Sequence, residues 1–255
     1  MLQVSSNSEN SINKLDLTPK LDFLKLFVQK DLTQFPKNKL SQVISYSVTL
    51  LEDRDYYMGL LIPFIIDKDH NSWSFATSII YSLSALYTIY DLTHMLQKTL
   101  RNKKPCCHIF VGEAVTQLAA LCSTVRSTEI IIQNENISNP LKIAIIDIFN
   151  NHNLDEHVLN SQMDILTDST KGELQKTLIY QDLCEKKQQL ILISLQICLL
   201  ITNQQMDTKR VEELSQLIFS VFLGNATPQV LTRIVQITRD TCFQQNIVEY
   251  LRYLL

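Results

Sequence analysis

Residues 101–108 bring together cationic, thiol and imidazole side chains, which could bind an anion, attack an electrophile or hold a metal ion. Cys106 and Cys107 stand beside His108, but the sequence offers no further group to orient a nucleophile. The chain has 6 cysteines at irregular spacing and no CxxC pair, which argues against a zinc knuckle or a disulfide framework. We therefore expect free thiols in a reducing compartment and a cytoplasmic protein.

Acidic side chains that could act with this cluster are few. Asp91 precedes it, with His94 three residues further on, and Asp240 lies far along the chain. A hard divalent cation needs several oxygen ligands, so Asp91 alone is a poor magnesium site. The sequence therefore predicts no metal site, and Asp91 is equally consistent with a solvated helix end.

The composition favours an all-α protein. Of the 255 residues, 45% are hydrophobic and 19% are charged, enough to bury a sizeable core. A formal net charge of -3 argues against broad contact with nucleic-acid phosphates. Only 4 Gly and 6 Pro occur, too few for a glycine-rich dinucleotide fold or a turn-rich β-sandwich. The longest uncharged stretches are interrupted by polar residues, so we expect no membrane span.

No repeat or linker divides the chain, so we expect one helical domain over residues 17–255 after a disordered polar leader at 1–16. Apolar periodicity and capping signals predict roughly eight to ten helices and no convincing strand. Thr18-Pro19 starts the first helix, and one long helix covers about residues 173–202. The predicted fold class is an all-α, single-domain helical bundle.

Two helices near the middle of the sequence carry the clearest patterns. The first is capped by Ser72 or Ser74 and ends in the polar stretch 97–104. Its stripe at helical spacing consists of Ala76, Ile79, Ile80, Leu83, Tyr87 and Tyr90. The second helix repeats Val111, Ala114, Val115, Leu118, Ala119 and Cys122. We expect the small residues Ala114 and Ala119 of the second stripe to allow close approach of a neighbouring helix.

Three segments of the chain resemble the isoprenyl diphosphate synthases. In that family a long helix ends in an aspartate-rich motif, and Arg-Arg-Gly-Lys-Pro, a His and Gly-Glu-Ala follow. This chain has Tyr90-Asp91-Leu92-Thr93-His94, then Leu100-Arg101-Asn102-Lys103-Lys104-Pro105-Cys106-Cys107-His108, then Gly112-Glu113-Ala114. The later stretch 182–190 is similar to the family's helix with a Lys-Thr pair and an apolar continuation. The matches span about residues 57–223 and imply the isoprenoid (terpenoid) synthase fold.

The resemblance also implies roles for individual residues. In the family, carboxylates hold three divalent metal ions, cations clamp the diphosphates, and the chain grows by isopentenyl units in an apolar cavity. The resemblance implies diphosphate binding by Arg101, Lys104, His108 and Lys186. It implies a cavity lined by Leu83, Tyr87 and Tyr90. The plainer alternatives are solvated cations and tyrosines packed in the core.

The departures from the family pattern concern the metal ligands. Asp91 stands alone where two or three aspartates belong, and the second aspartate-rich motif is missing. Near Asp240, Arg239 occupies the place of that motif's first aspartate, and Asn102 replaces the second arginine of the basic clamp. The resemblance is thus to a degenerate member whose frame is kept and whose metal motifs are lost.

We draw three hypotheses from this pattern. The first is a non-catalytic small subunit of a heteromeric long-chain polyprenyl diphosphate synthase. It would have no cofactor of its own and an exposed apolar patch for a catalytic partner or for self-association, with an isoprenoid diphosphate as candidate ligand. In such subunits a Gly-Asp often precedes the helix after the lost motif, and Gly112-Glu113 fits either that place or the Gly-Glu-Ala place.

The second hypothesis is an active prenyltransferase whose altered Mg²⁺ site uses Asp91, His94 and Asp240. The third is an all-helical scaffold without an isoprenoid role. A deep apolar pocket with Arg101, Lys104 and Lys186 at its mouth would argue against the scaffold. The first hypothesis agrees best with a retained frame and missing acids.

Overall fold

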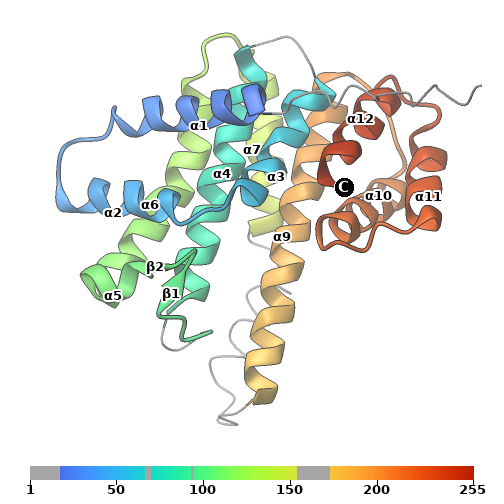
Figure 1. Cartoon of the computed structure of the whole chain (residues 1–255). Coiled ribbons are helices and arrows are strands. Elements are labelled where there is room, and N and C mark those ends of the chain that lie inside the picture. The colour runs from blue at the N-terminus through green and yellow to red at the C-terminus, as the bar shows by residue number, and fades with distance from the viewer. Residues whose placement is uncertain (1–17, 67–69, 93–94, 154–172) are drawn as a thin grey trace, which may run out of the picture.

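The computed structural model describes residues 18–66, 70–92, 95–153 and 173–255. The predicted leader and His94 lie outside these residues. The described part is a bundle of helices around α4, with α10, α11 and α12 gathered at one side (Figure 1). The helices are α1 Thr18–Leu32, α2 Lys39–Thr49, α3 Asp53–Ile65, α4 His70–Tyr90, α5 Cys107–Val111, α6 Glu113–Gln133, α7 Asn139–Asn153, α9 Glu173–Ile201, α10 Thr208–Phe222, α11 Pro228–Thr238 and α12 Gln244–Leu254.

Helix α4 is the centre of the bundle because α3, α6 and α9 all pack against it. Every member of its predicted stripe, from Ala76 to Tyr90, is buried, which confirms the stripe. Burying a large apolar side chain contributes about 1.5–3 kcal/mol, so this helix anchors the core. Its bounds differ from the prediction. The helix begins at His70, before Ser72, and ends at Tyr90 rather than in the stretch 97–104.

A small β-hairpin occupies the stretch after α4. Strand β1, Leu100–Arg101, pairs antiparallel with β2, Lys104–Pro105. Asn102 and Lys103 form the two-residue turn, and both have positive φ, as a hairpin turn that matches the strand twist requires. The prediction of no strand was therefore wrong here. Strands of two residues are too short to give an alternating pattern in the sequence.

The predicted stripe over residues 111–122 is confirmed only in part: Ala119 is buried, and Val111, Val115 and Cys122 are half-buried and pack against the core. Ala114 is exposed and Leu118 is 55% exposed. The buried face consists of Thr116, Ala119, Ala120, Ser123, Arg126, Ser127, Ile130 and Ile131. Small residues dominate this face because α6 makes its most extensive contact with α4, and short side chains let the two helices approach closely. Four larger aliphatic residues are left on the outer face: Leu118, Leu121, Val125 and Ile132.

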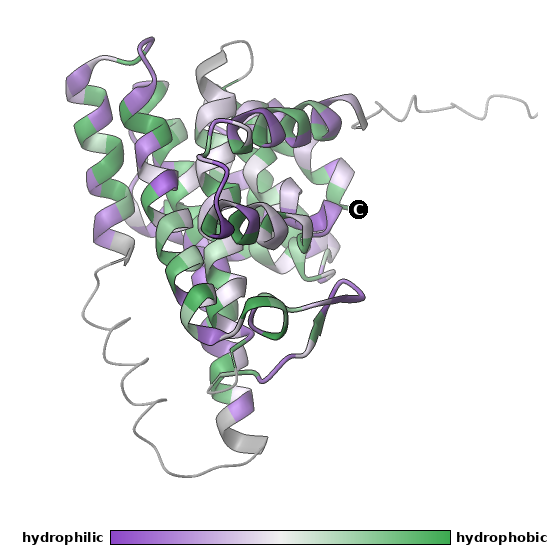
Figure 2. Ribbon diagram, turned by 90° about the vertical axis from the view of Figure 1, so that its left-hand side faces the viewer, coloured by the Kyte–Doolittle hydropathy of each residue, from purple (hydrophilic) through white to green (hydrophobic). Residues whose placement is uncertain are grey.

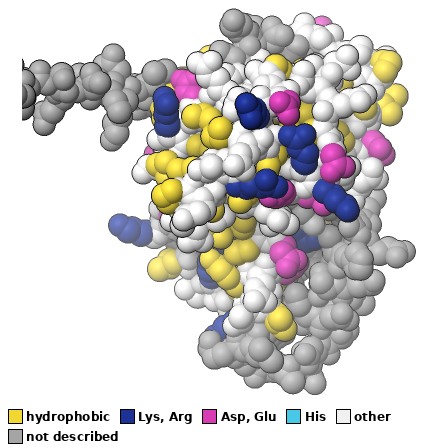
Figure 3. All heavy atoms as spheres, turned by 90° about the vertical axis from the view of Figure 1, so that its right-hand side faces the viewer, with side chains coloured by type: hydrophobic (Ala, Val, Ile, Leu, Met, Phe, Trp, Pro, Cys, Tyr) yellow, Lys and Arg dark blue, Asp and Glu magenta, His cyan; other side chains and the backbone are white. Residues whose placement is uncertain are grey.

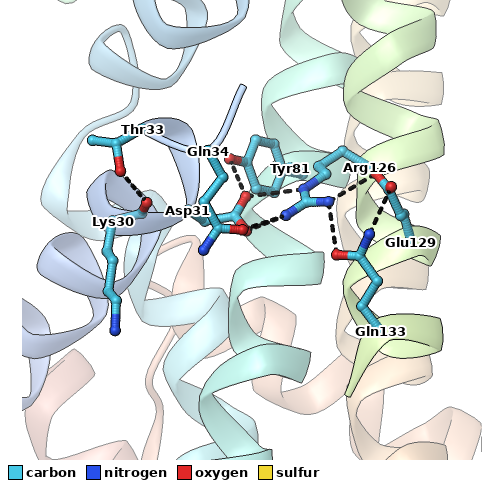
Figure 4. A network of polar contacts seen from close by, with 8 residues as sticks. All are labelled: Lys30, Asp31, Thr33, Gln34, Tyr81, Arg126, Glu129 and Gln133. Atoms are coloured by element: carbon cyan, nitrogen blue, oxygen red, sulfur yellow. Dashed lines mark hydrogen bonds and ion pairs between the residues drawn. The ribbon is translucent and has the colours of Figure 1, made fainter. Parts of the chain in front are cut away.

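A buried polar network fixes α1, α4 and α6 to one another (Figure 4). Arg126 of α6 donates hydrogen bonds to both carboxylate oxygens of Asp31 on α1, at 3.1 Å from Nε and 2.5 Å from Nη2. Tyr81 of α4 donates its hydroxyl to Asp31 Oδ2 at 2.8 Å. Burial, together with the Asp31 charge, raises the pKa of Tyr81, so its hydroxyl remains a donor. The network sets the register of three helices.

Helix α9 confirms the predicted long helix, and the second half of it is mostly buried. Among the described residues, no helix is long and apolar enough to cross a membrane. All six cysteines lie in the described part of the chain and are free, as predicted. On the side of the molecule with α10–α12, basic and acidic side chains intermingle (Figure 3).

Candidate functional site

Asp91, the remaining acid of the first motif, is bound to Arg101. It follows directly after α4, and Arg101 reaches it from β1 of the hairpin. Arg101 Nε lies 2.7 Å from Asp91 Oδ2, and Nη2 lies 2.6 Å from Oδ1. The side chains are 13% and 3% exposed, respectively. Burial would lower the pKa of Arg101, but the hydrogen bonds and charge of Asp91 raise it overall. Both oxygens of the carboxylate are therefore engaged by a permanent cation.

The neighbouring thiols of Cys106 and Cys107 are buried and stay protonated near neutral pH. Cys106 Sγ lies 3.4 Å from Asp91 Oδ2, and the Cys106 backbone N–H donates to the Thr99 carbonyl. Burial, followed by the charge of Asp91, raises the pKa of Cys106 to about 12 and that of Cys107 to about 11. Because the thiolate is the nucleophile, neither cysteine is suited to attack an electrophile.

Arg101 also lines a pocket of about 350 Å³, which we call the basic pocket. Its charged members are Glu52, Arg54, Asp55, Lys98, Arg101 and Lys187. The Arg101 guanidinium lies 3.8 Å from the centre of the Tyr87 ring, within cation–π distance. Tyr87 donates its hydroxyl to Asp55 Oδ1 at 2.7 Å. Four cations line the pocket against two acids, and Asp91 neutralises Arg101 from outside the lining, so the pocket keeps a small positive excess that would favour an anion.

Lys187 is the most buried amine described in this pocket. Its Nζ lies 3.9 Å from Asp55 Oδ1 and 5.2 Å from the centre of the Tyr87 ring. Burial lowers the pKa of Lys187, and the Asp55 charge offsets part of that effect. An anion entering the pocket would therefore be favoured, because it would restore charge compensation to a desolvated ammonium group.

A second hollow, which we call the central cavity, lies between α4, α6 and α9 and has a volume of about 370 Å³. It is lined by Ser82, Ala85, Leu86, Ile89, Tyr90, Gln117, Ala120, Leu121, Thr124, Lys186, Gln189, Leu190 and Ile193. Most of this lining is aliphatic or small. Lys186 adds a cationic member, and Tyr90 donates its hydroxyl to Asp182. The cavity is suited to an apolar chain with an anionic end.

The two hollows flank the contact between α4 and α9. Lys186 lines the central cavity, and its neighbour Lys187 lines the basic pocket. On α4, Tyr90 lines the central cavity, and Tyr87, about one turn earlier, lines the basic pocket.

The structure brings together only some of the residues expected at a diphosphate site. Arg101 lies in the basic pocket, whereas Lys186 lies in the central cavity. Lys104 is exposed and donates from Nζ to the Thr49 carbonyl at 3.1 Å. His108 is buried in α5, and its Nδ1 has no hydrogen-bond partner among the described residues. Arg101 is thus the cation of the predicted set that lies in the anion-type pocket.

The three residues predicted to line one cavity lie in three different places, and the predicted acids Asp91 and Asp240 lie apart. Tyr90 lines the central cavity, Tyr87 lines the basic pocket and Leu83 is fully buried in the core. Asp240 is exposed in the turn between α11 and α12, and α11 packs on α10 and α12 rather than on α4 (Figure 1). Asp240 and Asp91 therefore do not converge on one site.

Sequence reasoning missed Arg54, Asp55 and Lys187 as members of the basic pocket. Arg54 and Asp55 stand in the first turn of α3, where acidic residues are ordinarily explained by the helix dipole. Lys187 is adjacent to Lys186, and one residue step along an α-helix rotates the side-chain direction by about 100°. Only the packing of α9 against α3 and α4 decides which of the two faces the pocket.

The donor set does not fit a divalent metal ion. Among the described residues there is no group of three or more His, Cys, Asp or Glu side chains that could hold one. Asp91, the acid at the expected place, has both oxygens bound to Arg101. Magnesium requires several oxygen ligands in near-octahedral geometry, and these residues do not provide them.

No protein-family model matches the sequence, and no curated protein is significantly similar to it. Solved structures do match its fold. A geranyltransferase from Legionella pneumophila superposes with a TM-score of 0.69 at 16% identity, over 93% of this chain and 95% of that one. The chain has the all-α isoprenoid synthase fold.

Two further structures agree with this assignment. An isoprenoid synthase family member from Thermotoga neapolitana gives a TM-score of 0.69 at 14% identity, over 94% of this chain and 99% of that one. A putative farnesyl-diphosphate synthase from Marinomonas sp. MED121 gives 0.66 at 18% identity, again over 94% and 99%. At these identities the likeness establishes the fold, and the chemistry must be argued from the side chains of this chain.

Proposed function

We propose that this chain is a non-catalytic, prenyl-synthase-like subunit that supports chain elongation by a catalytic partner. The observation that carries the proposal is the ion pair of Asp91. The one acid left at the first motif is bound through both oxygens to Arg101, at 2.6 and 2.7 Å, and is almost fully buried. A carboxylate held in this way does not serve as a ligand for a catalytic magnesium ion.

The retained hollows support a binding role. The central cavity is lined by aliphatic residues and suits a prenyl chain, while the basic pocket suits a phosphate-type anion. Two of the similar solved structures are named as a geranyltransferase and as a putative farnesyl-diphosphate synthase, and both names refer to prenyl groups. We infer an isoprenoid diphosphate as the ligand class. Six free thiols agree with a reducing, cytoplasmic setting.

The test is a reconstitution. The purified chain is incubated with Mg²⁺, an allylic diphosphate and isopentenyl diphosphate, first alone and then with a candidate catalytic synthase from the same source. We expect no product from the chain alone, and a change in rate or product length when both proteins are present.

Two outcomes would overturn the proposal. One is product formation by the chain alone that Asp91→Asn abolishes, because Asp91 would then be catalytic. The other is a partner synthase whose rate and product length are the same with and without this chain. Lys187→Met serves as a binding variant: loss of isoprenoid diphosphate affinity by calorimetry would support the basic pocket as the anion site. Unchanged affinity would contradict that assignment.

A further inference from the structure

Lys187 is an amine in largely aromatic surroundings. Its side chain is 15% exposed, and its Nζ lies 5.2 Å from the centre of the Tyr87 ring and 5.8 Å from that of the Phe222 ring. Asp55 Oδ1 lies 3.9 Å from this Nζ, which is beyond hydrogen-bond length. The Asp55 carboxylate already accepts hydrogen bonds from the Tyr87 hydroxyl and from the Glu52 backbone N–H. The ammonium form of Lys187 is therefore poorly compensated.

Two arginines make the charged form of Lys187 less favourable still. The Arg101 guanidinium lies 3.8 Å from the centre of the same Tyr87 ring, and the Arg54 guanidinium lies 5.4 Å from the centre of the Phe222 ring. Burial lowers the pKa of Lys187, and the charges of the two arginines lower it further. Arginine keeps its proton in proteins, so Lys187 is the one of these three cations that can become a neutral nucleophile.

The basic pocket leads from solvent to this amine. Its rim consists of the exposed residues Glu52, Arg54, Leu100, Asn102, Tyr180 and Leu223. Its floor consists of the buried residues Leu50, Asp55, Tyr87 and Phe222. The hydrophilic turn of the hairpin, which carries Asn102, stands away from the helices at the lower right of Figure 2. A small solute can therefore reach Lys187 while the chain stays folded.

The other cations of the pocket select the kind of electrophile that Lys187 would meet. Arg54, Lys98 and Arg101 line the pocket together with it. Arginine and lysine side chains bind phosphate oxygens through charge-assisted hydrogen bonds. An acyl phosphate carries such a phosphate next to an activated carbonyl carbon. When its phosphate is bound, that carbon shares a pocket of about 350 Å³ with the amine, which raises the effective concentration of each toward the other.

We propose that Lys187 is an acylation site, that acyl phosphates bound in the basic pocket are its acyl donors, and that acylation abolishes anion binding there. The neutral amine attacks the carbonyl carbon, an N–C bond forms, and the C–O bond to the phosphate breaks. The amine proton leaves with the phosphate, so the products are an amide and hydrogen phosphate. The first two statements stand whatever the function of the chain. The third concerns regulation of the anion site and rests on the proposed function.

Acylation would change the charge balance of the pocket. The amide that replaces the ammonium group is neutral, so the pocket loses one of its four cations. Glu52 and Asp55 remain, and Arg101 remains paired with Asp91. The small positive excess that favours an anion is thereby removed, and the acyl group also fills part of the space.

The first statement is tested by incubating the full chain with acetyl phosphate near neutral pH and following acetylation of each lysine by peptide mass spectrometry. Lys186 and Lys209 are internal controls, because Lys186 lines the central cavity and Lys209 is exposed. We expect Lys187 to react at least ~10-fold faster than either, since each unit by which a lysine pKa falls raises the neutral fraction about tenfold. Saturating inorganic phosphate should protect Lys187 and leave Lys209 unaffected. Equal rates, or no protection by phosphate, overturn the proposal.

Two substitutions separate binding of the donor from reactivity of the amine. Lys98→Gln removes a cation that lines the pocket, whereas Lys103→Gln removes an exposed cation of the hairpin turn that does not line it. We expect only Lys98→Gln to slow acetylation of Lys187 by acetyl phosphate. With p-nitrophenyl acetate, which has no phosphate, both variants should react as the original chain does. Slowing by Lys98→Gln with neither donor, or to the same extent with both, overturns the second statement.

The regulatory statement is tested by calorimetry with inorganic pyrophosphate. The original chain and Lys187→Arg, which keeps a cation that acyl phosphates do not modify, are titrated before and after treatment with acetyl phosphate. After treatment we expect a pyrophosphate Kd at least ~10-fold weaker for the original chain and no change for Lys187→Arg. Undiminished affinity of the acetylated original chain overturns this statement. A chain that binds no pyrophosphate before treatment overturns it together with the proposed anion site, whereas the acetylation rates are judged separately.

Discussion

Two buried arginine–aspartate pairs hold different parts of this molecule, and they differ in what they join. Arg126 and Asp31 are 95 residues apart and fix α6 to α1, with Tyr81 of α4 completing the contact (Figure 4). Arg101 and Asp91 are 10 residues apart and join a hairpin to the end of the preceding helix. Both arginines grip a carboxylate through two nitrogens. The first pair organises the bundle, whereas the second occupies the place where the fold's enzymes are expected to hold metal.

The largest expected effect is on the pair that joins three helices. Arg126→Ala leaves Asp31 buried without its cation and removes the contacts to Glu129 and Gln133. We expect the free energy of unfolding to fall by about 3–5 kcal/mol, measured by urea denaturation.

The control for this comparison is the exposed pair of Arg233 on α11 and Glu213 on α10, which lies at 2.6 Å. Exposed ion pairs contribute little, so Arg233→Ala should give an unfolding curve that overlays the original. Equal losses for Arg126→Ala and Arg233→Ala would contradict the view that the three-helix network organises the bundle.

A smaller effect is expected at the second pair. Arg101→Ala removes the cation from Asp91, but Arg101 lines the basic pocket, so water can enter the space left by its side chain and partly solvate the buried carboxylate. We expect a loss of about 1–3 kcal/mol in unfolding free energy, with faster amide exchange confined to the hairpin and the end of α4. Hydrogen-exchange mass spectrometry checks this, and a loss of protection throughout α1 and α6 would contradict it.

The thiols beside Asp91 give a chemical readout of the same region. The pKa of Cys106, at about 12, lies about three units above its ordinary value, so its thiolate fraction near pH 8 is about a thousandfold lower. Cys242 is exposed. Iodoacetamide labelling followed by mass spectrometry should modify Cys242 first, with Cys106 and Cys107 protected until the chain unfolds. Labelling of Cys106 as fast as Cys242 would be inconsistent with the structure.

A further prediction is a dependence of stability on alkaline pH. Folding raises the pKa values of Cys106 and Cys107 above the unfolded value near 9, so the folded state keeps protons that the unfolded state loses. The stabilising contribution is complete below pH 9 and is lost as the pH rises toward 11–12. Urea denaturation at about pH 8 and about pH 10.5 should show this fall. The fall should be smaller in the Cys106→Ala/Cys107→Ala variant, and an unchanged slope would contradict the assignment.

Features that depend on residues close together in the sequence could be predicted, whereas features that depend on contacts between distant residues could not. The stripe of α4 and the length of α9 were predictable because the spacing of apolar residues within one helix is visible in the sequence. The buried face of α6 was not, because its small and polar residues are buried by pairing with partners such as Asp31, which is distant in sequence. Here tertiary contact overrides the pattern of hydrophobicity.

The residues of the candidate site also differ in whether the sequence could predict them. Arg101 could be named from a local resemblance, and it lies in the basic pocket. Its bond to Asp91 gives no signal in the sequence, because a separation of 10 residues across a turn has no fixed period. Lys187 was passed over for Lys186, since the choice between adjacent residues depends on how α9 is rotated against its neighbours.

The ion pair of Arg101 and Asp91 also constrains how a magnesium site could be built at this place. New acids at neighbouring positions such as Leu92 would enter a place already neutralised by a guanidinium, and each would gain little by binding magnesium while that cation remains. Releasing the arginine first leaves a lone buried carboxylate and a weaker hairpin. Either first step is unfavourable by itself, so a magnesium site at this place would require the replacement of Arg101 and the addition of acids together.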